Sequence, residues 1–420
     1  MQRDVYKTSR VLYIIEAALE YFISILVGGA YLAKLTAELG IPDSITGILS
    51  SLVTLGCSFQ LLAILLFHKR RAKLGVLFLH TLNQLFFTLI YVVPFFPLGK
   101  TAKIVVFIAL LLLAHILNNI VQSPKINWFM SLIDNAKRGR FTANKEIISL
   151  IGGMLFSLAA GAMMDHYKDK GDIRTAFIIC GIALFVLTVL HSCTLLFSRE
   201  KPQEWKEEKM LRSVADLLRD KEFIKVLLIP ILWGVSHCAT YFYGTYQTKE
   251  LGFSMTFISV LSIMYAISRS LFSRPLGRFA DKHSFAKMLN ICYAVAAVAF
   301  LINTFTHPTN GRILYPIYYV LYAISMAGIN SSEINLIYER VAPSQRMLAF
   351  ALKNTLAGLA GFATTLLSSL LFDYIQSNNF VLFGVQIYAQ QVMSLISAVL
   401  TVGTIVYLNL MVKSKPKCEA

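Results

Sequence analysis

Long apolar runs constrain this chain more than any other feature of its sequence. A helix needs about 20 apolar residues to span the ~30 Å hydrocarbon core of a bilayer, and twelve runs of about this length follow one another along the 420 residues. They cover residues 11–35, 43–67, 74–97, 101–123, 144–166, 174–197, 223–246, 254–275, 286–305, 312–336, 346–372 and 380–412. Within lipid, backbone polar groups must be hydrogen-bonded inside their own segment. The runs therefore predict an all-α polytopic membrane protein with twelve transmembrane helices.

The composition and the charge distribution agree with a membrane protein. Only 15% of residues are charged and 56% are hydrophobic, whereas soluble domains carry about 25% charged residues. The net charge of +16 raises nucleic-acid binding as an alternative, but 31 of the 39 Lys and Arg residues fall on one side of the predicted helices. The positive-inside rule places this side, with both termini, in the cytoplasm of a cell. The basic excess thus indicates topology and contact with anionic lipids, and no nucleic-acid partner.

A charged linker divides the chain into two halves. Residues 198–222 include seven basic and seven acidic side chains, and their apolar positions predict one amphipathic helix on the membrane surface. The flanking segments, 1–197 and 223–420, match at an offset of 208 residues, with similar helix limits. The matched pairs are Arg138 and Arg346, Lys145 and Lys353, Gly153 and Gly361, and Asp165 and Asp373. Four matches at one offset predict a repeated six-helix bundle on either side of a cytoplasmic linker.

The sharpest motif follows the run 254–275, where Gly277 is followed by three residues, Asp281 and Lys282. It resembles the loop signature of the major facilitator superfamily, with Ser284 in place of a second glycine, and the chain resembles bacterial transporters of this family over nearly its whole length. The resemblance implies two pseudo-symmetric six-helix bundles and a loop that ties helix ends together through its carboxylate. A plain surface charge cluster is the alternative. The predicted cytoplasmic gate comprises Gly277, Arg278, Asp281, Lys282 and Arg346.

Two glutamates in the first apolar run are candidate proton-coupling residues. A carboxylate near the bilayer centre costs about 2.5–3.5 kcal/mol on insertion scales and is a functional candidate. Glu16 and Glu20 lie one helical turn apart and share a face. His115, in the run 101–123, reaches a depth similar to that of Glu20, so we expect a Glu20–His115 pair that binds and releases a proton. Packing residues that are satisfied by hydrogen bonds are the alternative.

Aromatic and amide side chains in other runs predict a substrate site. Trp233, His237 and Tyr241 recur at four-residue spacing, which suits either helix packing or contact with a ring-bearing solute. His80, Asn83 and Gln84 form a further polar patch, which we interpret as structural. The predicted substrate-binding residues are Glu20, Asn118, Asn119, Trp233, His237, Tyr241 and Asn330.

These features predict a secondary active transporter that moves a small organic solute by alternating access, with protons as the coupling ion. A multidrug or cation exporter and a sugar-type nutrient importer both remain open. A membrane sensor and a lipid-acting enzyme are further alternatives, although no nucleophile or metal constellation supports an enzyme. The sequence has no phosphate-binding loop, and the six cysteines show no metal spacing. We therefore expect a monomer with no cofactor and no metal site.

Overall fold

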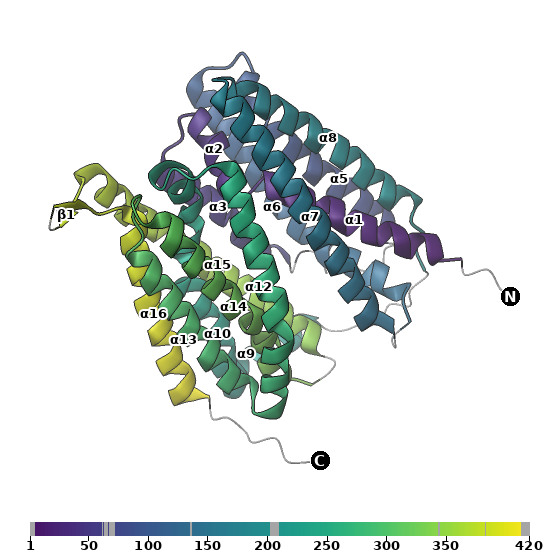
Figure 1. The fold of residues 1–420 in the computed structure, drawn as a ribbon. Helices are drawn as coiled ribbons and strands as arrows, with labels where there is room; N and C mark the ends of the chain where they lie inside the picture. The colour runs from purple at the N-terminus through teal and green to yellow at the C-terminus, as the bar shows by residue number, and fades with distance from the viewer. Residues whose placement is uncertain are drawn as a thin grey trace. The chain divides into compact units, whose positions relative to one another are not determined.

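The computed structural model is almost entirely α-helical (Figure 1). It describes residues 5–60, 62, 66, 72–134, 137–201, 210–342, 345–382 and 384–412. Within these residues, ten helices are long and apolar enough to cross a membrane, and a bent helix pair and one shorter apolar helix accompany them. The prediction of an all-α polytopic membrane protein is therefore confirmed.

The chain divides into two compact units. Unit 1 comprises Met1–Lys206 and Phe253–Ser259. Its α-helices are α1 (Lys7–Leu26), α2 (Gly29–Glu38), α3 (Asp43–Cys57), α5 (Ala72–Ile90), α6 (Lys100–Ser131), α7 (Arg138–Asp169) and α8 (Ile173–Phe197), with a 3-10 turn η1 (Val93–Phe95). Helix α1 packs against α7 and α8, while α5 packs against α6 and α8. This arrangement brings one face of α1 close to residues from three other helices.

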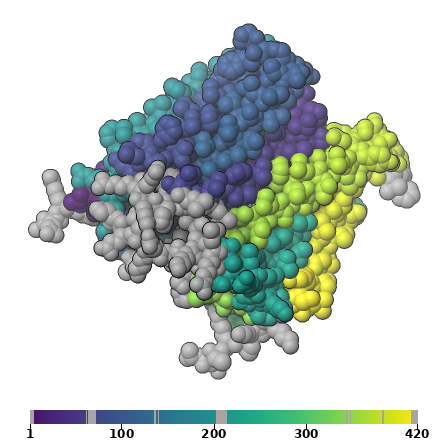
Figure 2. All heavy atoms as spheres, turned by 180° about the vertical axis from the view of Figure 1, so that it is seen from behind, coloured from purple at the N-terminus to yellow at the C-terminus, as the bar shows by residue number. Residues whose placement is uncertain are grey.

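Unit 2 comprises Glu207–Gly252 and Val260–Ala420. Its elements are α9 (Met210–Arg219), α10 (Lys221–Ser236), η3 (Cys238–Phe242), α11 (Tyr243–Thr245), η4 (Tyr246–Glu250), α13 (Phe285–Thr304), α14 (Gly311–Tyr338), α15 (Arg346–Asn378), β1 (Val381–Leu382), β2 (Val385–Gln386) and α16 (Ala389–Met411), together with most of α12 (Met255–Lys282). Helix α13 packs against α14 and α16, and α10 packs against α15 and α16. Figure 2 shows α16 in yellow beside α15 in yellow-green.

Two predicted helices are broken in the structure. The run 11–35 forms α1 and α2, which meet at a bend of 44°. Gly29 lies at the bend with a φ of +51°, a conformation that glycine adopts without the steric cost of a Cβ atom. The run 223–246 begins as α10 and then continues through the 3-10 and π turns η3 and η4. Apolar length thus predicts the span and does not show where its backbone changes direction.

The apolar runs 101–123 and 144–166 predict a connection between them, but helix extends into this segment from both sides. Helix α6 extends to Ser131 with Pro124 inside it, and α7 already begins at Arg138. Trp128 and Phe129 are buried in the extension, so packing holds a helix that the proline alone disfavours. As a result, Lys125 lies inside a helix and is buried, although its charge suggests a loop.

Two further boundaries differ from the prediction. Residues 277–282 form the end of α12 rather than a loop, and Ser284 then caps α13 by accepting a hydrogen bond from the Lys287 N–H at 3.1 Å. The last run does not begin as helix, because β1 pairs antiparallel with β2 before α16. Helix α9 lies in the predicted linker, whose residues 202–209 are outside the described part.

Candidate functional site

The two acidic residues of α1 lie on its buried side. Glu16 is fully buried, and the Glu20 side chain is 22% exposed. The i, i+4 spacing of an α-helix puts both carboxylates on one face, one turn apart. Because α1 packs against α7 and α8, this face points into the interior of unit 1. Both acids therefore need partners from neighbouring helices.

Lys125 of α6 supplies the main partner for both carboxylates. Its ammonium nitrogen lies 2.8 Å from Glu16 Oε1 and 2.5 Å from Glu20 Oε2. The same nitrogen is 3.2 Å from His80 Nε2 on α5. Charge-assisted hydrogen bonds of this kind are the strong ones in a protein interior. Lys125 thus joins α1, α5 and α6 at one point.

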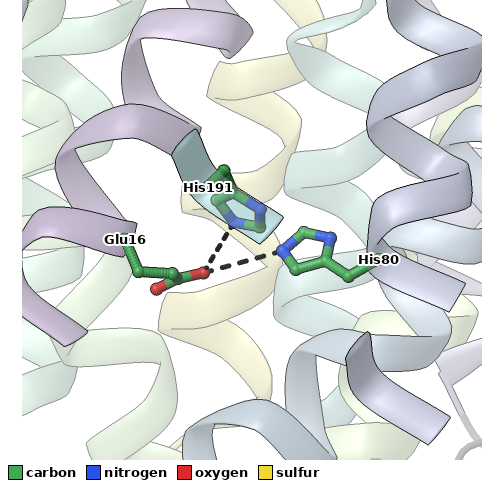
Figure 3. A group of neighbouring side chains, drawn as sticks. All are labelled: Glu16, His80 and His191. Carbon is green, nitrogen blue, oxygen red and sulfur yellow. Dashed lines mark hydrogen bonds and ion pairs between the residues drawn. The ribbon is translucent and has the colours of Figure 1, made fainter. Parts of the chain in front are cut away.

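Two histidines complete the group of side chains shown in Figure 3. His191 of α8 places Nε2 3.0 Å from Glu16 Oε1, and His80 places Nε2 3.7 Å from the same oxygen. The two imidazole rings meet edge to face with their centroids 4.5 Å apart. We call Glu16, Glu20, His80, Lys125 and His191 the ionic cluster. All of its members except Glu20 are almost completely inaccessible to solvent.

Hydrogen bonds around His80 assign its tautomer. Asn83 Nδ2 donates to the Ala114 carbonyl at 2.6 Å, which leaves Asn83 Oδ1 as an acceptor 3.2 Å from His80 Nδ1. His80 therefore carries its proton on Nδ1, and its Nε2 accepts from the ammonium of Lys125. His191 donates from Nε2 to Glu16. Its Nδ1 and the second oxygen of Glu16, Oε2, are buried and have no hydrogen-bond partner within the described residues.

The charges of the ionic cluster do not cancel when its two glutamates and its lysine are ionised. With both glutamates ionised, Lys125 charged and both histidines neutral, its net charge is −1. A buried net charge is costly, and one added proton removes it. Solvent reaches Glu20 more easily than Glu16, because Glu20 alone in the cluster is appreciably exposed. The cluster thus combines buried ionisable groups with one carboxylate that solvent reaches.

The structure gives Glu20 different partners from those expected. Glu20 accepts hydrogen bonds from Lys125 and from Gln122 Nε2, the latter at 2.5 Å. His115 instead packs edge-on against Phe87 at 5.2 Å, and its Nδ1 has no hydrogen-bond partner among the described residues. The expected Glu20–His115 pair is not formed in this structure, because Gln122 and Lys125, about two and three turns further along α6, bind Glu20 instead.

The two amides of α6 that were predicted to bind substrate, Asn118 and Asn119, have different partners. Gln122 Nε2 also lies 3.3 Å from Asn118 Oδ1, so Asn118 is joined to Glu20 through Gln122. Asn119 donates back to the His115 carbonyl of its own helix at 3.0 Å. Of the two predicted substrate-binding amides, only Asn118 is thus connected with the ionic cluster.

In unit 2, the predicted aromatic residues lie next to one another on α10 and η3. The His237 ring stacks on Trp233 with the centroids 5.2 Å apart, and Tyr241 Oη lies 3.3 Å from His237 Nε2. Tyr293 of α13 also lies next to Trp233, with the ring centroids 5.2 Å apart and the rings tilted by 32°. His237 Nδ1 donates to the Trp233 carbonyl at 2.6 Å. These four rings form one row, which contains the His237 imidazole and the Tyr241 hydroxyl as polar groups.

A second buried ion pair lies beside this row. Glu333 of α14 pairs with Lys353 of α15 at 3.1 Å, and the Tyr293 hydroxyl donates to Glu333 Oε1 at 3.0 Å. Asn330 is half-buried and lies on α14 three residues before Glu333. The aromatic row and the ion pair are thus one connected polar group within unit 2, joined through Tyr293.

The predicted gate residues lie at helix ends. Gly277, Arg278, Asp281 and Lys282 occupy the last two turns of α12. Arg346 is the first residue of α15, and its guanidinium lies over the Tyr338 ring at 5.4 Å. These positions keep the charged groups at the ends of long apolar helices.

The sequence interpretation missed three members of the ionic cluster. Lys125 was assigned to a connection, His80 to a structural patch, and His191 was not considered. The available signal was the rarity of ionisable residues inside apolar runs, which makes each of them a functional candidate. His191 satisfies this criterion, because it lies in the run 174–197. Lys125 does not, since it follows Pro124 at the apparent end of a run.

The helical units and the buried ionic groups define a polytopic membrane transporter rather than an enzyme. The chain belongs to the Major Facilitator Superfamily, because the model of that family matches residues 14–248 and 238–417. It is therefore a multi-pass membrane protein with the major facilitator fold. No curated protein matches the chain significantly.

Solved structures of transporters share this fold. A mutant of the nucleoside transporter NupG matches with a TM-score of 0.74 and 15% identity, over 96% of this chain and 100% of its own. A D-xylose-proton symporter matches with a TM-score of 0.72 and 13% identity, over 97% and 98%. The POT family transporter PepTSo matches with a TM-score of 0.71 and 11% identity, over 96% and 97%. At these identities the likeness shows the fold alone.

Proposed function

We propose that this protein is a secondary active transporter that couples the movement of a small organic solute to protons by alternating access. The observation that carries the proposal is the ionic cluster, in which two glutamates share one lysine in the interior of unit 1. Its net charge of −1 favours the uptake of one proton. A D-xylose-proton symporter among proteins of the same fold supports this coupling.

The shared lysine explains how a proton acts on the helices. In the unprotonated state, Lys125 binds Glu16 and Glu20 together and so ties α6 to α1 at two successive turns. Protonation of Glu20 removes its charge and leaves Glu16 as the only carboxylate that attracts the ammonium. Protonation thus weakens one of the two links between α1 and α6. A conformation that depends on this link therefore has a lower proton affinity than one that does not. A ligand or proton shifts a conformational equilibrium only through such a difference.

The residues of unit 2 favour a neutral solute with a ring. His237 and Tyr241 are half-buried beside the buried Trp233, and they combine ring surface with a hydrogen-bonded imidazole and hydroxyl. The buried carboxylate of Glu333 already has Lys353 and Tyr293 as partners. Binding of a cationic drug-like compound would have to break that pair, whereas a sugar or nucleoside would not. The nucleoside and D-xylose transporters of the same fold agree with this substrate class.

Asn118 and Asn330 are proposed as further substrate contacts, since both amides are partly accessible. Glu16 and Glu20 are the proposed proton-coupling residues. The gate residues at the end of α12 and Arg346 are proposed to act at the cytoplasmic face, with both termini on that side of a cell membrane. The protein is proposed to work as a monomer in two bundles joined by the segment 198–222.

The experiment begins with a search for the ligand. Purified protein is screened for thermal stabilisation by sugars, nucleosides, amino acids and cationic drugs, since a ligand that binds only the folded state raises its stability. The best ligand is then supplied to proteoliposomes with and without a pH gradient. Proton coupling predicts that the gradient drives accumulation of the ligand in the wild type.

The matched variants are Glu20→Gln and Glu222→Gln. Glu20→Gln is expected to abolish accumulation driven by the pH gradient while exchange of labelled for unlabelled ligand continues. Glu222 is 58% exposed and pairs with Lys225 at a helix start, so Glu222→Gln should leave both activities unchanged. Accumulation that is equal in wild type and Glu20→Gln would refute coupling through the ionic cluster. Absence of any ligand flux would refute transport of the tested classes.

A further inference from the structure

The donor atoms of the ionic cluster surround a single cation position. Glu16 Oε1, Glu20 Oε2 and His80 Nε2 lie 2.8, 2.5 and 3.2 Å from the Lys125 ammonium nitrogen. Glu16 Oε1, His80 Nε2 and His191 Nε2 all lie within 4.8 Å of one another (Figure 3). Three donors from α1 and α5 therefore surround the place that the lysine occupies, and His191 of α8 adds a fourth beside Glu16 at 3.0 Å.

These donors are of the types that bind transition metals. Imidazole nitrogen and carboxylate oxygen are the usual non-sulfur ligands of Zn²⁺, at about 2.0–2.2 Å from the ion. Two histidines with carboxylates also suit neighbouring divalent transition metals, whereas Mg²⁺ prefers oxygen ligands and keeps its water. The charges match as well, because the two carboxylates balance a divalent cation when Lys125 is absent from the site.

The surroundings of His80 provide an independent observation. A metal-binding histidine characteristically donates its other ring N–H to a fixed acceptor, which orients the ring and its lone pair. His80 Nδ1 has such a partner in Asn83, and Asn83 is itself held by the Ala114 carbonyl. The lone pair of His80 Nε2 is thereby directed at the cation position. Glu16 also retains a buried oxygen, Oε2, without a partner in the described structure.

We propose that the ionic cluster is a binding site for a divalent transition-metal ion, with Zn²⁺ as the best match, and that the Lys125 ammonium is a built-in competitor for it. The lysine carries its charge on a flexible four-carbon stem, and Glu20 gives the site a partly exposed side. Binding requires His191 to carry its proton on Nδ1, which has no hydrogen-bond partner in the described structure, instead of on Nε2. The bound ion would then tie α1, α5 and α8 together through Glu16, His80 and His191.

The spacing of the residues conceals such a site in the sequence. His80 and His191 are 111 positions apart, and Glu16 precedes His80 by 64 positions. Motifs for metal sites depend on ligands that are close together along the chain. Here each ligand comes from a different helix, and packing brings them together.

The test measures Zn²⁺ binding to the purified full-length protein with a chromophoric zinc indicator as competitor. Lys125→Met removes the ammonium, and we expect it to bind one Zn²⁺ per chain at least about tenfold more tightly than the wild type does. In the Lys125→Met background, His80→Gln and His191→Gln should each weaken binding at least about tenfold, and Asn83→Ala about tenfold or more. Mg²⁺ at the same concentration should not compete.

His166 and His283 are exposed and provide the control for surface sites. Their replacement by glutamine should leave Zn²⁺ affinity unchanged. The proposal is overturned if Lys125→Met does not raise the affinity, or if binding depends on His166 and His283 rather than on His191. If Lys125→Met does not yield a folded protein, His191→Gln and His283→Gln in the otherwise unchanged chain decide, and equal Zn²⁺ affinities of these two variants overturn it. None of these readouts requires transport, so they are independent of the proposed proton coupling.

Discussion

Lys125 and Glu333 lie 208 residues apart, at matching positions of the two halves, and carry opposite charges. Each is buried in a long apolar helix, and each has partners of opposite sign within its own unit. Lys125 binds Glu16 and Glu20, while Glu333 binds Lys353. Both halves therefore have an ionisable residue at this position, a basic one in the first half and an acidic one in the second. Lys125 joins α6 to α1, which is distant in sequence, whereas Glu333 and Lys353 join the consecutive helices α14 and α15. Each unit thus has a polar centre.

The first prediction concerns the stability of the ionic cluster. Lys125→Met leaves two carboxylates buried without a cation, and removal of one partner from such a pair costs about 3–5 kcal/mol. The double variant Lys125→Met, Glu16→Gln should recover part of this loss, because one unpaired charge disappears with it. Unfolding free energies in mixed micelles give the coupling energy, expected at about 0.5–3 kcal/mol. Additive effects of the two substitutions would contradict the Lys125–Glu16 pair.

The second prediction compares the ion pair of unit 2 with a surface pair. Lys353→Met removes the cation beside Glu333, whose side chain is only 2% exposed, and should cost about 3 kcal/mol. Tyr293→Phe removes one hydrogen bond to the same carboxylate and should cost about 1 kcal/mol. The control is Lys225→Met, which breaks an exposed pair and should not change the midpoint of unfolding. Equal effects of Lys353→Met and Lys225→Met would refute the role of burial.

The third prediction tests the close contact of α10 with α15. A Cβ atom added at Gly234 would lie 2.8 Å from the Ala357 carbonyl oxygen, which belongs to the backbone and has little freedom to move. Gly234→Ala should therefore destabilise unit 2 by about 1–3 kcal/mol. At Gly403 of α16 an added Cβ has nothing within 4 Å, so Gly403→Ala should be neutral or stabilising by about 0.5–1 kcal/mol. A neutral Gly234→Ala would show that the two helices are not packed this closely.

The fourth prediction concerns pH and the start of α8. Asp172 accepts hydrogen bonds from the Thr175 hydroxyl at 2.6 Å and from its backbone N–H at 3.2 Å, and these bonds lower the pKa of the Asp172 carboxyl below its usual value of 3.8. A lowered pKa in the folded state means that the stabilisation is present above 3.8 and is lost as pH falls through the lowered pKa. Asp172→Ala should therefore lower the melting temperature near pH 7. The difference from wild type should shrink in strongly acidic buffer, and a difference that grows there would contradict the capping role.

Much of the architecture could be predicted from apolar length and charge. The runs predict the membrane-spanning helices because lipid leaves the backbone no other partner than its own helix. Ends of helices are less predictable, as Pro124 shows: its effect on the local backbone is unfavourable, but buried Trp128 and Phe129 hold α6 beyond it. Local rules thus identify the elements, and packing determines where some of them end.

The candidate site shows the same division between sequence and tertiary structure. The sequence by itself determined that Glu16 and Glu20 share a helix face and that two carboxylates in an apolar run need partners, because the helical period and the cost of burying charge are local properties. Only the tertiary structure decided that the partners are Lys125, His80 and His191 rather than His115. These residues come from α6, α5 and α8, and the distances among them depend on how the helices pack, which no spacing along the chain encodes.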